Sequence, residues 1–388
     1  MDMRAQIAAS GSREAGVRAR GWLIVALFFG LILAPAATQL AQLGAAPGQE
    51  NRILAPPPQW VGFRRLRDFT KATDAYIDDH FGLRDRLVHW NSRLRYRLGA
   101  SSTPKVVIGS DGWLFYAGEK IIEQHTGEDV FTPAELERWV EVMTANRDWL
   151  ARRGIAFIIT IAPDKSTIYP EKLPTHPRPP GRTTRADQLV ARLRTTDLVL
   201  VDPREALHEA KRSFPKLYFE GDSHWTQRGA FIAYSQLMEA VRAKFPNAAL
   251  ASLDDYDIAW GPAAASDLAF LLALHGDLSY TAERFTRRST HQLRTTVRNP
   301  TPGGWGWPIK FIETDLKAQP RLLVFGDSFT DYVLGPTFLF ESFRDPVFTH
   351  HNGGTFNFTL VDEVKPDLVI FALAERYIAL PPQVPLGF

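Results

Sequence analysis

The sequence predicts an α/β fold in which helices cover both faces of a parallel sheet, preceded by one N-terminal apolar segment. Strands that are apolar throughout occur in "IAFIITIAP", "RLLVFGD" and "PDLVIFALAE". Amphipathic helices separate them, an alternation typical of a parallel sheet buried on both sides. The 388 residues are 45% hydrophobic and 23% charged, the ordinary range for a globular chain with a sizeable core.

The first element is an apolar run without charges, "GWLIVALFFGLILAPAA", from Gly21 to Ala37. Its length is near the lower limit for a membrane-spanning helix. Arginines precede the run and none directly follows it, which predicts a cytoplasmic N-terminus over 1–20, a transmembrane anchor over 21–38 and an exported remainder. A cleaved signal peptide is the alternative, because "APAAT" offers small residues to a peptidase.

A linker rich in Ala, Gly and Pro is expected over 39–62, and the folded domain over 63–388. The domain begins with a helical stretch, "RLRDFTKATDAYIDDHFGLRDRLVHWNSRLRYRLG", which Gly99 would end. We interpret its many arginines, interleaved with acidic residues, as a solvated face. "VVIGSDGWLFY" then predicts a hairpin with Asp111 and Gly112 at its turn.

Helices and strands alternate after the hairpin. The predicted helices are "PAELERWVEVMTANRDWLARRG", "TRADQLVARLRTT", "REALHEAKR", "TQRGAFIAYSQLMEAVRAKF" and "TLVDEVK", with Thr226 capping the fourth. The predicted strands are "IAFIITIAP", "DLVLVD", "RLLVFGD", "DPVFTH" and "PDLVIFALAE". The alternation fails between 247 and 319, so the sequence predicts an irregular insertion there.

Composition excludes several kinds of site. The chain has no cysteine, which excludes disulfides, thiolate catalysis and cysteine-ligated metal centres. A net charge of +2 gives no support for a nucleic-acid partner. His350 and His351, taken with Asp222 and His224, lack a second acid at ligand spacing, so no metal site is predicted.

The strongest candidate nucleophile is Ser328. The strand "LLVF" ends at Phe325, and Gly326 permits a tight turn that leaves Ser328 at the carboxyl edge of the sheet, where open α/β sheets bind ligands. A helix beginning near Ser328 would direct its free N–H groups at a developing oxyanion. The alternative is that Asp327 or Ser328 only caps this helix.

The stretch "GDSHWT" places Asp222 and His224 two residues apart in a loop before a helix. Histidine suits the removal of a serine proton near neutral pH, and it needs an acceptor at Nδ1 to fix its tautomer. Asp222 provides that acceptor, and Ser223 is expected to be a spacer; the alternative is a capped turn with a structural histidine. With Ser328 as nucleophile, His224 as base and Asp222 as orienting acid, the set suits serine acyl transfer.

"GDSF" after a buried strand and "DSHW" resemble the serine and Asp-x-x-His-type motifs of the SGNH hydrolase superfamily. The acid–histidine pair precedes the serine here, and this reversed order is similar to the alginate O-acetyltransferase family. Further stretches resemble that family from Glu50 to Tyr377: "ENRILAPPP", "DDHFGLRD", "VVIGSDGWLFY", "PDKSTIYPEKLP", "HGDLS" and "KPDLVIFALAERYI". The resemblance implies an SGNH hydrolase-like domain with rearranged motif order.

The resemblance also implies a function. It implies a periplasmic O-acetyltransferase, anchored to the inner membrane or cleaved from its anchor, that carries an acetyl group on Ser328 and passes it to hydroxyls of an exopolysaccharide such as alginate. A multi-spanning membrane O-acyltransferase is the implied donor partner, and no cofactor is implied. The alternatives are a polysaccharide acetylesterase with the same triad and a non-catalytic polysaccharide-binding or assembly subunit.

Four further residues follow predicted strands and are candidates for oxyanion or substrate contacts. Asn352 and Gly353 lie in "HHNGGTFN", where a glycine-rich turn is the alternative. Arg376 in "AERYI" is a candidate for holding an anionic sugar, with structural pairing to Glu375 as the alternative. Lys165 in "APDKSTIYP" is expected either to face the site or to lie in a surface turn.

Overall fold

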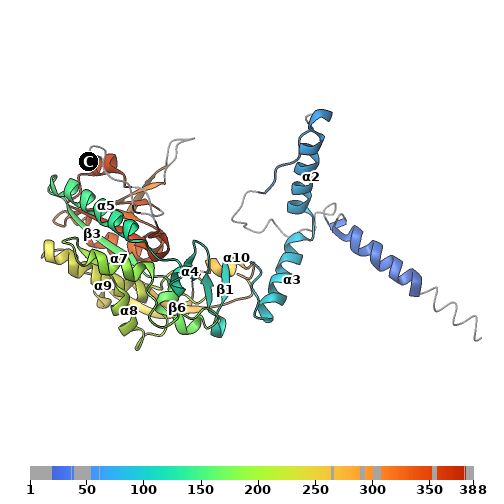
Figure 1. Ribbon diagram of the computed structural model, residues 1–388, viewed down its shortest axis with the longest axis horizontal. Coiled ribbons are helices and arrows are strands. Elements are labelled where there is room, and N and C mark those ends of the chain that lie inside the picture. The colour runs from blue at the N-terminus through green and yellow to red at the C-terminus, as the bar shows by residue number, and fades with distance from the viewer. Residues whose placement is uncertain are drawn as a thin grey trace, which may run out of the picture. The chain divides into compact units, whose positions relative to one another are not determined.

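The computed structural model describes residues 20–35, 37–38, 54–60, 62–263, 266–288, 293–299, 307–351, 356–379 and 381. The chain divides into two compact units, Met1–Leu98 and Gly99–Phe388, and each is described by itself (Figure 1). The sequence placed residues 63–98 in the same domain as the rest, whereas the structure assigns them to the first unit.

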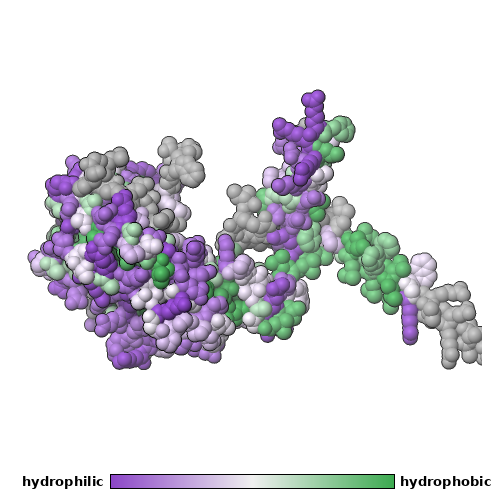
Figure 2. Space-filling view, viewed as in Figure 1, coloured by the Kyte–Doolittle hydropathy of each residue, from purple (hydrophilic) through white to green (hydrophobic). Residues whose placement is uncertain are grey.

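The first unit is helical. Residues 20–35 and 37–38 form helix, and hydrophobic side chains cover the face of it seen in Figure 2. Among the described residues, no helix combines the length and the apolar character needed to span a bilayer. The elements that follow are η1 (Phe63–Arg65), α2 (Leu66–His80) and α3 (Arg84–Arg97).

The helical stretch predicted before Gly99 is thus divided into two helices. Helix α2 ends at Phe81, which has an extended backbone with ψ 138°. Gly99 follows α3 with φ +71°, the left-handed conformation in which helices commonly end.

The second unit opens with the predicted hairpin. Strands β1 (Val106–Ile108) and β2 (Leu114–Tyr116) pair antiparallel. The turn between them, η2 (Ser110–Gly112), holds Asp111 and Gly112 at positive φ. The hairpin prediction is confirmed, including its turn residues.

Seven strands form the central sheet in the order β4-β3-β11-β9-β10-β8-β7. The first five run parallel. They are β4 (Leu200–Val201), β3 (Ala156–Ala162), β11 (Leu368–Ala374), β9 (Arg321–Gly326) and β10 (Arg344–His350). This confirms the predicted parallel sheet, and the carboxyl ends of these strands meet at one edge.

Helices cover both faces of this sheet, because side chains of each strand alternate between two cores. In β11, Ile370 belongs to one core and Phe371 to the other. Helices α5 (Pro133–Ala151), α7 (Arg185–Leu193) and α11 (Phe358–Val364) cover the Phe371 face. Helices α8 (Arg204–Ala210), α9 (Gln227–Lys244) and the π-helix η5 (Thr330–Leu339) cover the other. Short helices complete the unit: α4 (Ile121–Thr126), α6 (Lys165–Ile168), η3 (Pro170–Lys172), η6 (Phe340–Ser342) and η7 (Glu375–Tyr377).

The segment 247–319, expected to be irregular, contains regular elements. They are η4 (Leu253–Asp255), β5 (Tyr256–Pro262), α10 (Asp267–Leu271), β6 (Thr281–Arg287), β7 (Arg294–Arg298) and β8 (Ile309–Glu313). Strands β5 and β6 form a separate antiparallel pair, while β8 extends the central sheet antiparallel to β10, and β7 pairs antiparallel with β8. Every residue of β7 is exposed and only two of the seven residues of β6 are buried, so these strands lack the continuous apolar runs by which the sequence identified the buried strands.

Candidate active site

The candidate nucleophile lies where β9 ends. Gly326 is the last residue of the strand. Only glycine fits there without a shift of its neighbours, because a Cβ would lie 2.8 Å from the Phe348 ring. Asp327 follows as a helix cap: its Oδ1 accepts a hydrogen bond from the Phe329 N–H at 3.0 Å, and its other oxygen accepts one from the Ala374 N–H on β11. Ser328 is the first helical residue after this turn. The predicted strand, tight turn and helix are all present.

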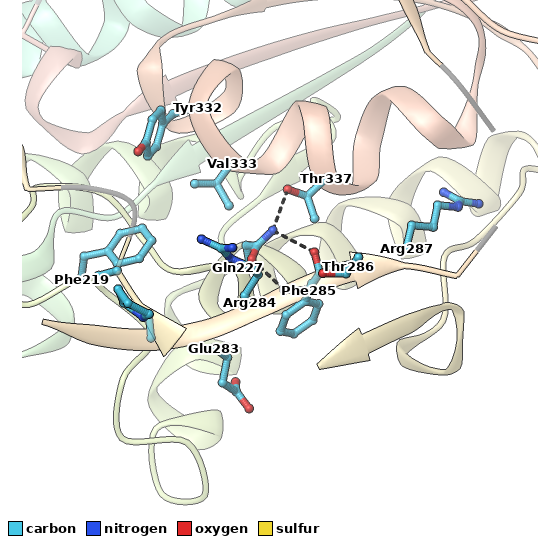
Figure 3. A pocket seen from close by; sticks show the side chains of 13 residues that line it. Phe219, Gln227, Glu283, Arg284, Phe285, Thr286, Arg287, Tyr332, Val333 and Thr337 are labelled. Carbon is cyan, nitrogen blue, oxygen red and sulfur yellow. Dashed lines mark hydrogen bonds between the residues drawn. The ribbon is translucent and has the colours of Figure 1, made fainter. Parts of the chain in front are cut away.

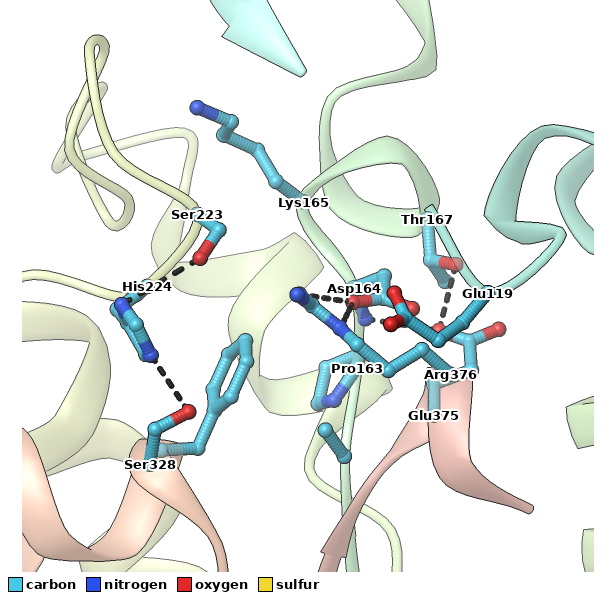
Figure 4. A network of polar contacts seen from close by, with 12 residues as sticks. Glu119, Pro163, Asp164, Lys165, Thr167, Ser223, His224, Ser328, Glu375 and Arg376 are labelled. Atoms are coloured by element: carbon cyan, nitrogen blue, oxygen red, sulfur yellow. Dashed lines mark hydrogen bonds and ion pairs between the residues drawn. The ribbon is translucent and has the colours of Figure 1, made fainter. Parts of the chain in front are cut away.

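Asp222, His224 and Ser328 form one continuous chain of hydrogen bonds. The Oγ of Ser328 lies 2.8 Å from Nε2 of His224 (Figure 4). Oδ1 of Asp222 lies 2.7 Å from Nδ1 of His224. The side chains of His224 and Asp222 are 13% and 5% exposed. The structure therefore brings together residues 104 positions apart in the arrangement that proton transfer from a serine requires.

The loop that carries His224 is held from both sides. The His224 carbonyl accepts a hydrogen bond from the Phe219 N–H at 3.1 Å, which closes a small antiparallel bridge. The indole N–H of Trp225 donates to the carbonyl of Phe329 at 3.1 Å. Thr226 then caps α9, as predicted, by accepting from the Gly229 N–H. The Trp225 contact ties the histidine loop directly to the nucleophile turn.

Asp222 is ionised near neutral pH. Burial alone would favour its protonated form, but hydrogen bonds and the charge of His224, together with the Asp267 N–H, lower the pKa of Asp222 to about 2. A charged acceptor at Nδ1 fixes the neutral ring with its proton on Nδ1, so that Nε2 is free to accept the Ser328 proton.

The structure also reveals a residue that the sequence did not predict. Asp267, at the start of α10, receives hydrogen bonds from both the N–H and the Oγ of Ser223. Ser223 is thus not merely a spacer between Asp222 and His224. No local pattern identifies Asp267, since it lies in the segment expected to be irregular.

Lys165 is buried beneath the histidine loop rather than lying in a surface turn. Its side chain is fully engaged, since Nζ donates to the carbonyls of Phe219, Glu220 and Asp222 at 2.9, 3.2 and 2.6 Å. Burial lowers the pKa of Lys165 to about 7, while the neighbouring carboxylates of Asp267 and Asp222 oppose this. These contacts support the loop that carries His224; a role in substrate binding stays a prediction.

Arg376 is buried at the end of β11 and pairs with Asp164, not with Glu375. Its Nε donates to Oδ1 of Asp164 at 2.7 Å (Figure 4). Glu375 accepts instead from the Asp164 N–H and from the Thr167 hydroxyl, and burial beside Asp164 raises its pKa to about 7. The guanidinium of Arg376 lies 5.2 Å from the ring centroid of Phe329. Arg376 therefore packs under the nucleophile turn, and its assignment to an anionic sugar stays a prediction.

The two remaining candidates, Asn352 and Gly353, lie outside the described residues. The strand before them, β10, ends at His350, which pairs in register with Gly326. His351 follows; its Nε2 lies 3.0 Å from the carbonyl of Ala372, and burial lowers its pKa to about 4. His351 is thus a structural histidine at the same edge of the sheet.

A groove of about 560 Å³ adjoins the site between β6 and η5 (Figure 3). Phe219 and Tyr332 line it, and the ring centroids of Tyr332 and His224 are 5.4 Å apart. Arg284 also lines the groove; its side chain is exposed and makes no hydrogen bond or ion pair within the described part of the chain. The groove thus combines an aromatic face with an available cation.

One set of side chains offers metal-ligand atoms in the described ranges. Single ligand atoms of Asp222, His224 and Asp267 lie within 4.8 Å of one another. The Nδ1 of His224 is hydrogen-bonded to Asp222, and the Asp267 carboxylate accepts from Ser223. The donor set is therefore accounted for by proton-mediated contacts, the arrangement expected of a histidine base.

Comparison with known proteins identifies the family. Residues 106–359, more than half of the chain, match the family described as "SGNH hydrolase-like domain, acetyltransferase AlgX". The match bears out the resemblance noted from the "GDSF" and "DSHW" motifs, since both motifs lie within the matched residues.

Two similar curated proteins are named "Probable alginate O-acetylase AlgJ". The protein from Pseudomonas fluorescens is 27% identical over 183 residues, which are 46% of this chain and 44% of that protein. The protein from Pseudomonas syringae pv. tomato is 26% identical over 225 residues, 58% of this chain and 53% of that protein. The chain thus spans about half the length of the curated relatives it matches.

A solved structure shows the same fold. The structure of Bacillus cereus PatB1 superposes with a TM-score of 0.50 at 14% identity, covering 69% of this chain and 95% of that chain. At this identity the likeness concerns the fold alone, and it agrees with the mostly parallel sheet described above. The family match, which extends over the hairpin, the histidine loop and the nucleophile turn, shows that the chain belongs to the family of SGNH hydrolase-like AlgX acetyltransferase domains.

Proposed function

We propose that the chain is a polysaccharide O-acetyltransferase that works through an acetyl ester on Ser328. The observation that carries the proposal is the unbroken relay from Asp222 through His224 to Ser328 in a chain of an acetyltransferase family. A serine hydroxyl becomes nucleophilic only when a base receives its proton, and His224 lies at hydrogen-bond distance to do so.

In the first half-reaction, Oγ of Ser328 attacks the carbonyl carbon of an acetyl ester donor while Nε2 of His224 takes the hydroxyl proton. The bond to the donor's leaving oxygen then breaks, and that oxygen takes the proton back from His224. The proposed donor to the oxyanion formed in between is the N–H of Ser328, because the N–H groups of Phe329, Thr330 and Asp331 already donate to Asp327.

In the second half-reaction, a sugar hydroxyl replaces the leaving group. It gives its proton to His224 and attacks the acetyl carbonyl, and Ser328 recovers its proton when the ester to the enzyme breaks. The groove of Figure 3 is the proposed position of the acceptor, because Tyr332, which lines it, lies beside the imidazole and provides an aromatic face for a sugar ring. An exopolysaccharide of the alginate kind is the proposed acceptor, in keeping with the names of the curated relatives.

The proposed location is the periplasm, with the apolar segment at 21–38 as anchor to the inner membrane or as cleaved signal. The arginines before this segment support that orientation. The proposed donor partner is a multi-spanning membrane O-acyltransferase, because an exported domain has no access to cytoplasmic acyl donors.

The test uses 4-nitrophenyl acetate as donor and an alginate oligosaccharide as acceptor. The wild-type chain is expected to release nitrophenol and to acetylate the oligosaccharide, whereas Ser328→Ala is expected to do neither while keeping the wild-type melting temperature. Mass spectrometry of a trapped reaction should find 42 Da more on the peptide that contains Ser328 (roughly one acetyl group replacing a proton).

Three results would contradict the proposal. Equal activity of Ser328→Ala and wild type would show that another group carries the acetyl. Free acetate without any acetylated sugar would indicate the esterase alternative. Absence of both activities and of any covalent labelling by a serine-directed sulfonyl fluoride would indicate the binding-subunit alternative.

A further inference from the structure

Helix α10 (Asp267–Leu271), from the segment between β5 and β6, packs against the loop that carries the triad acid. The N–H groups of Leu268 and Ala269 both donate to the carbonyl of Gly221 at 3.2 Å. The N–H of Asp267 donates to Oδ2 of Asp222 at 2.8 Å. The main chain of α10 thus occupies the carboxylate oxygen of Asp222 that does not face the imidazole, and leaves Oδ1 to His224.

The side chain of Asp267 makes a second set of contacts with the same loop. Its Oδ1 accepts from the Ser223 N–H at 2.8 Å, and its Oδ2 accepts from the Ser223 hydroxyl at 2.6 Å. These two bonds place Oδ2 of Asp267 3.9 Å from Nδ1 of His224. The imidazole therefore faces two carboxylates on its Nδ1 side, one in hydrogen-bond contact and one just beyond it.

Besides its bonds to Ser223, the Asp267 carboxylate adds a second negative charge beside Asp222. Burial and the nearby charge of Asp222 raise the pKa of Asp267, so its ionised form is held at a cost, which the His224 charge and the hydrogen bonds from Ser223 reduce. A like charge next to Asp222 is tolerated where a cation lies between or beside the two. Lys165 is one such cation, and the His224 imidazolium formed during each proton transfer is another.

We propose, resting on the serine acyl-transfer function given above, that Asp267 is a positioning residue whose carboxylate stabilises the protonated state of His224 and whose bonds to Ser223 fix the triad loop. It acts through His224 and not on the substrate. The charged and titratable groups that face Asp267 are Asp222 and His224 on the loop, Lys165 on α6 and Tyr332 on η5. His224 also interacts electrostatically with Asp327, before the helix of Ser328, and with Asp164, after β3.

The test compares Asp267→Asn with Ser223→Ala in the full-length chain, with release of nitrophenol from 4-nitrophenyl acetate as the readout. Asp267→Asn keeps the size and the acceptor for the Ser223 N–H but removes the charge. We expect it to lower the acylation rate at pH 7 roughly two- to fivefold, the range of a partly exposed charge pair. The acid limb of its pH–rate profile should also move to lower pH, because loss of a nearby negative charge makes the imidazole easier to deprotonate.

Ser223→Ala provides the matched control, since it removes one bond to Asp267 and leaves the charge in place. It should lower the rate without moving the acid limb. Asp222→Asn should cost far more, about 10³- to 10⁴-fold, because the triad acid itself is lost. Asp267→Glu, which keeps the charge, should leave the acid limb at the wild-type position and keeps the test valid if Asp267→Asn fails to fold.

The proposal is overturned if Asp267→Asn retains both the wild-type rate and the wild-type acid limb, or if Ser223→Ala moves the limb as far as Asp267→Asn does. A moved limb in Asp267→Glu would also contradict it. These failures differ from failure of the proposed function, in which the wild-type chain itself would show no Ser328-dependent nitrophenol release.

Discussion

The two ring nitrogens of His224 have different partners, and in the proposed mechanism this difference sets the direction of proton transfer. Nδ1 faces the ionised Asp222 at 2.7 Å, while Nε2 faces the neutral Ser328 hydroxyl at 2.8 Å. A proton held on Nδ1 by a carboxylate leaves Nε2 as the basic atom. The chemistry of the site therefore depends on which oxygen of Asp222 is available, and the N–H of Asp267 occupies the other one.

Lys165 is predicted to be a main support of this arrangement. Replacing it by methionine keeps the aliphatic volume but leaves the carbonyls of Phe219, Glu220 and Asp222 without their common donor. We expect Lys165→Met to lower the free energy of unfolding by about 3 kcal/mol, the range for unsatisfied buried polar groups. Urea denaturation followed by circular dichroism measures this loss.

Lys172 supplies the control, because it makes a single ion pair with Asp111 at the surface. Lys172→Met should cost less than about 1 kcal/mol, as surface pairs generally do. Equal losses in the two variants would mean that the three carbonyls are satisfied in some other way when Lys165 is replaced.

The three residues that the sequence predicted to act together do lie in hydrogen-bond contact, whereas the residues that support them were not predicted. Ser328, His224 and Asp222 were predicted because their residue types and their positions at strand ends and before a helix suffice to suggest the reaction. Asp267 gave no signal, since its role depends on contacts with residues more than 40 positions away. The Arg376 pairing with Asp164 likewise joins residues 212 positions apart, and the adjacent Glu375 was the wrong partner.

At the level of elements, the turn from β9 into the helix of Ser328 leaves no room for a side chain at position 326. A Cβ on Gly326 would lie 2.8 Å from the Phe348 ring and 3.0 Å from Cβ of Thr330. We expect Gly326→Ala to destabilise the chain by about 1–3 kcal/mol, the usual cost of overpacking. It should also lower the acylation rate about 100-fold by displacing Ser328, since a shift of about 1 Å has that effect.

Thermal denaturation and nitrophenol release measure the two effects. Gly261→Ala in β5 is the control, because nothing lies within 4 Å of the added Cβ, and it should change stability by less than about 0.5 kcal/mol. A Gly326→Ala variant as stable and active as Gly261→Ala would show that the turn has more freedom than these distances allow.

The buried strands were predictable and the exposed ones were not, for a physical reason. Strands β3, β9 and β11 are covered on both faces, so every position must be apolar and the run is visible in the sequence. Strands β6 and β7 are mostly exposed, with polar and charged residues such as Arg284 and Arg294 along them. Their existence depends on pairing with neighbours, which a local pattern does not reveal.

The whole second unit is predicted to lose stability in acid through its buried histidines. The side chain of His351 is 1% exposed and stacks on the ring of Phe371. Burial lowers the pKa of His351 from 6.5 to about 4. Unfolding exposes the ring, which then takes up a proton near pH 6.5, so between pH 6.5 and 4 the unfolded chain binds more protons. Lowering the pH through this range therefore favours unfolding.

The size of this effect follows from the shift. His351 should contribute a loss of roughly 2 kcal/mol in the free energy of unfolding between pH 7 and pH 5. His351→Gln, which keeps a donor for the Ala372 carbonyl, should make the fall in stability shallower by that amount. The exposed His275→Gln serves as control and should keep the wild-type slope. If the free energy of unfolding fell equally with pH in the wild type, His351→Gln and His275→Gln, a neutral buried His351 would be contradicted.

The edge where the parallel strands end has a consequence for the order in which site residues occur in the sequence. Neighbouring strands hold Ala162 beside Ala374 and His350 beside Gly326, so distances at this rim are set by pairing between strands and not by the route of the backbone. A histidine that precedes the serine in the sequence reaches hydrogen-bond distance of it as readily as one that follows the serine. The order in which these groups occur along the chain therefore does not decide whether they meet, since His224 and Ser328 are in hydrogen-bond contact across 104 positions.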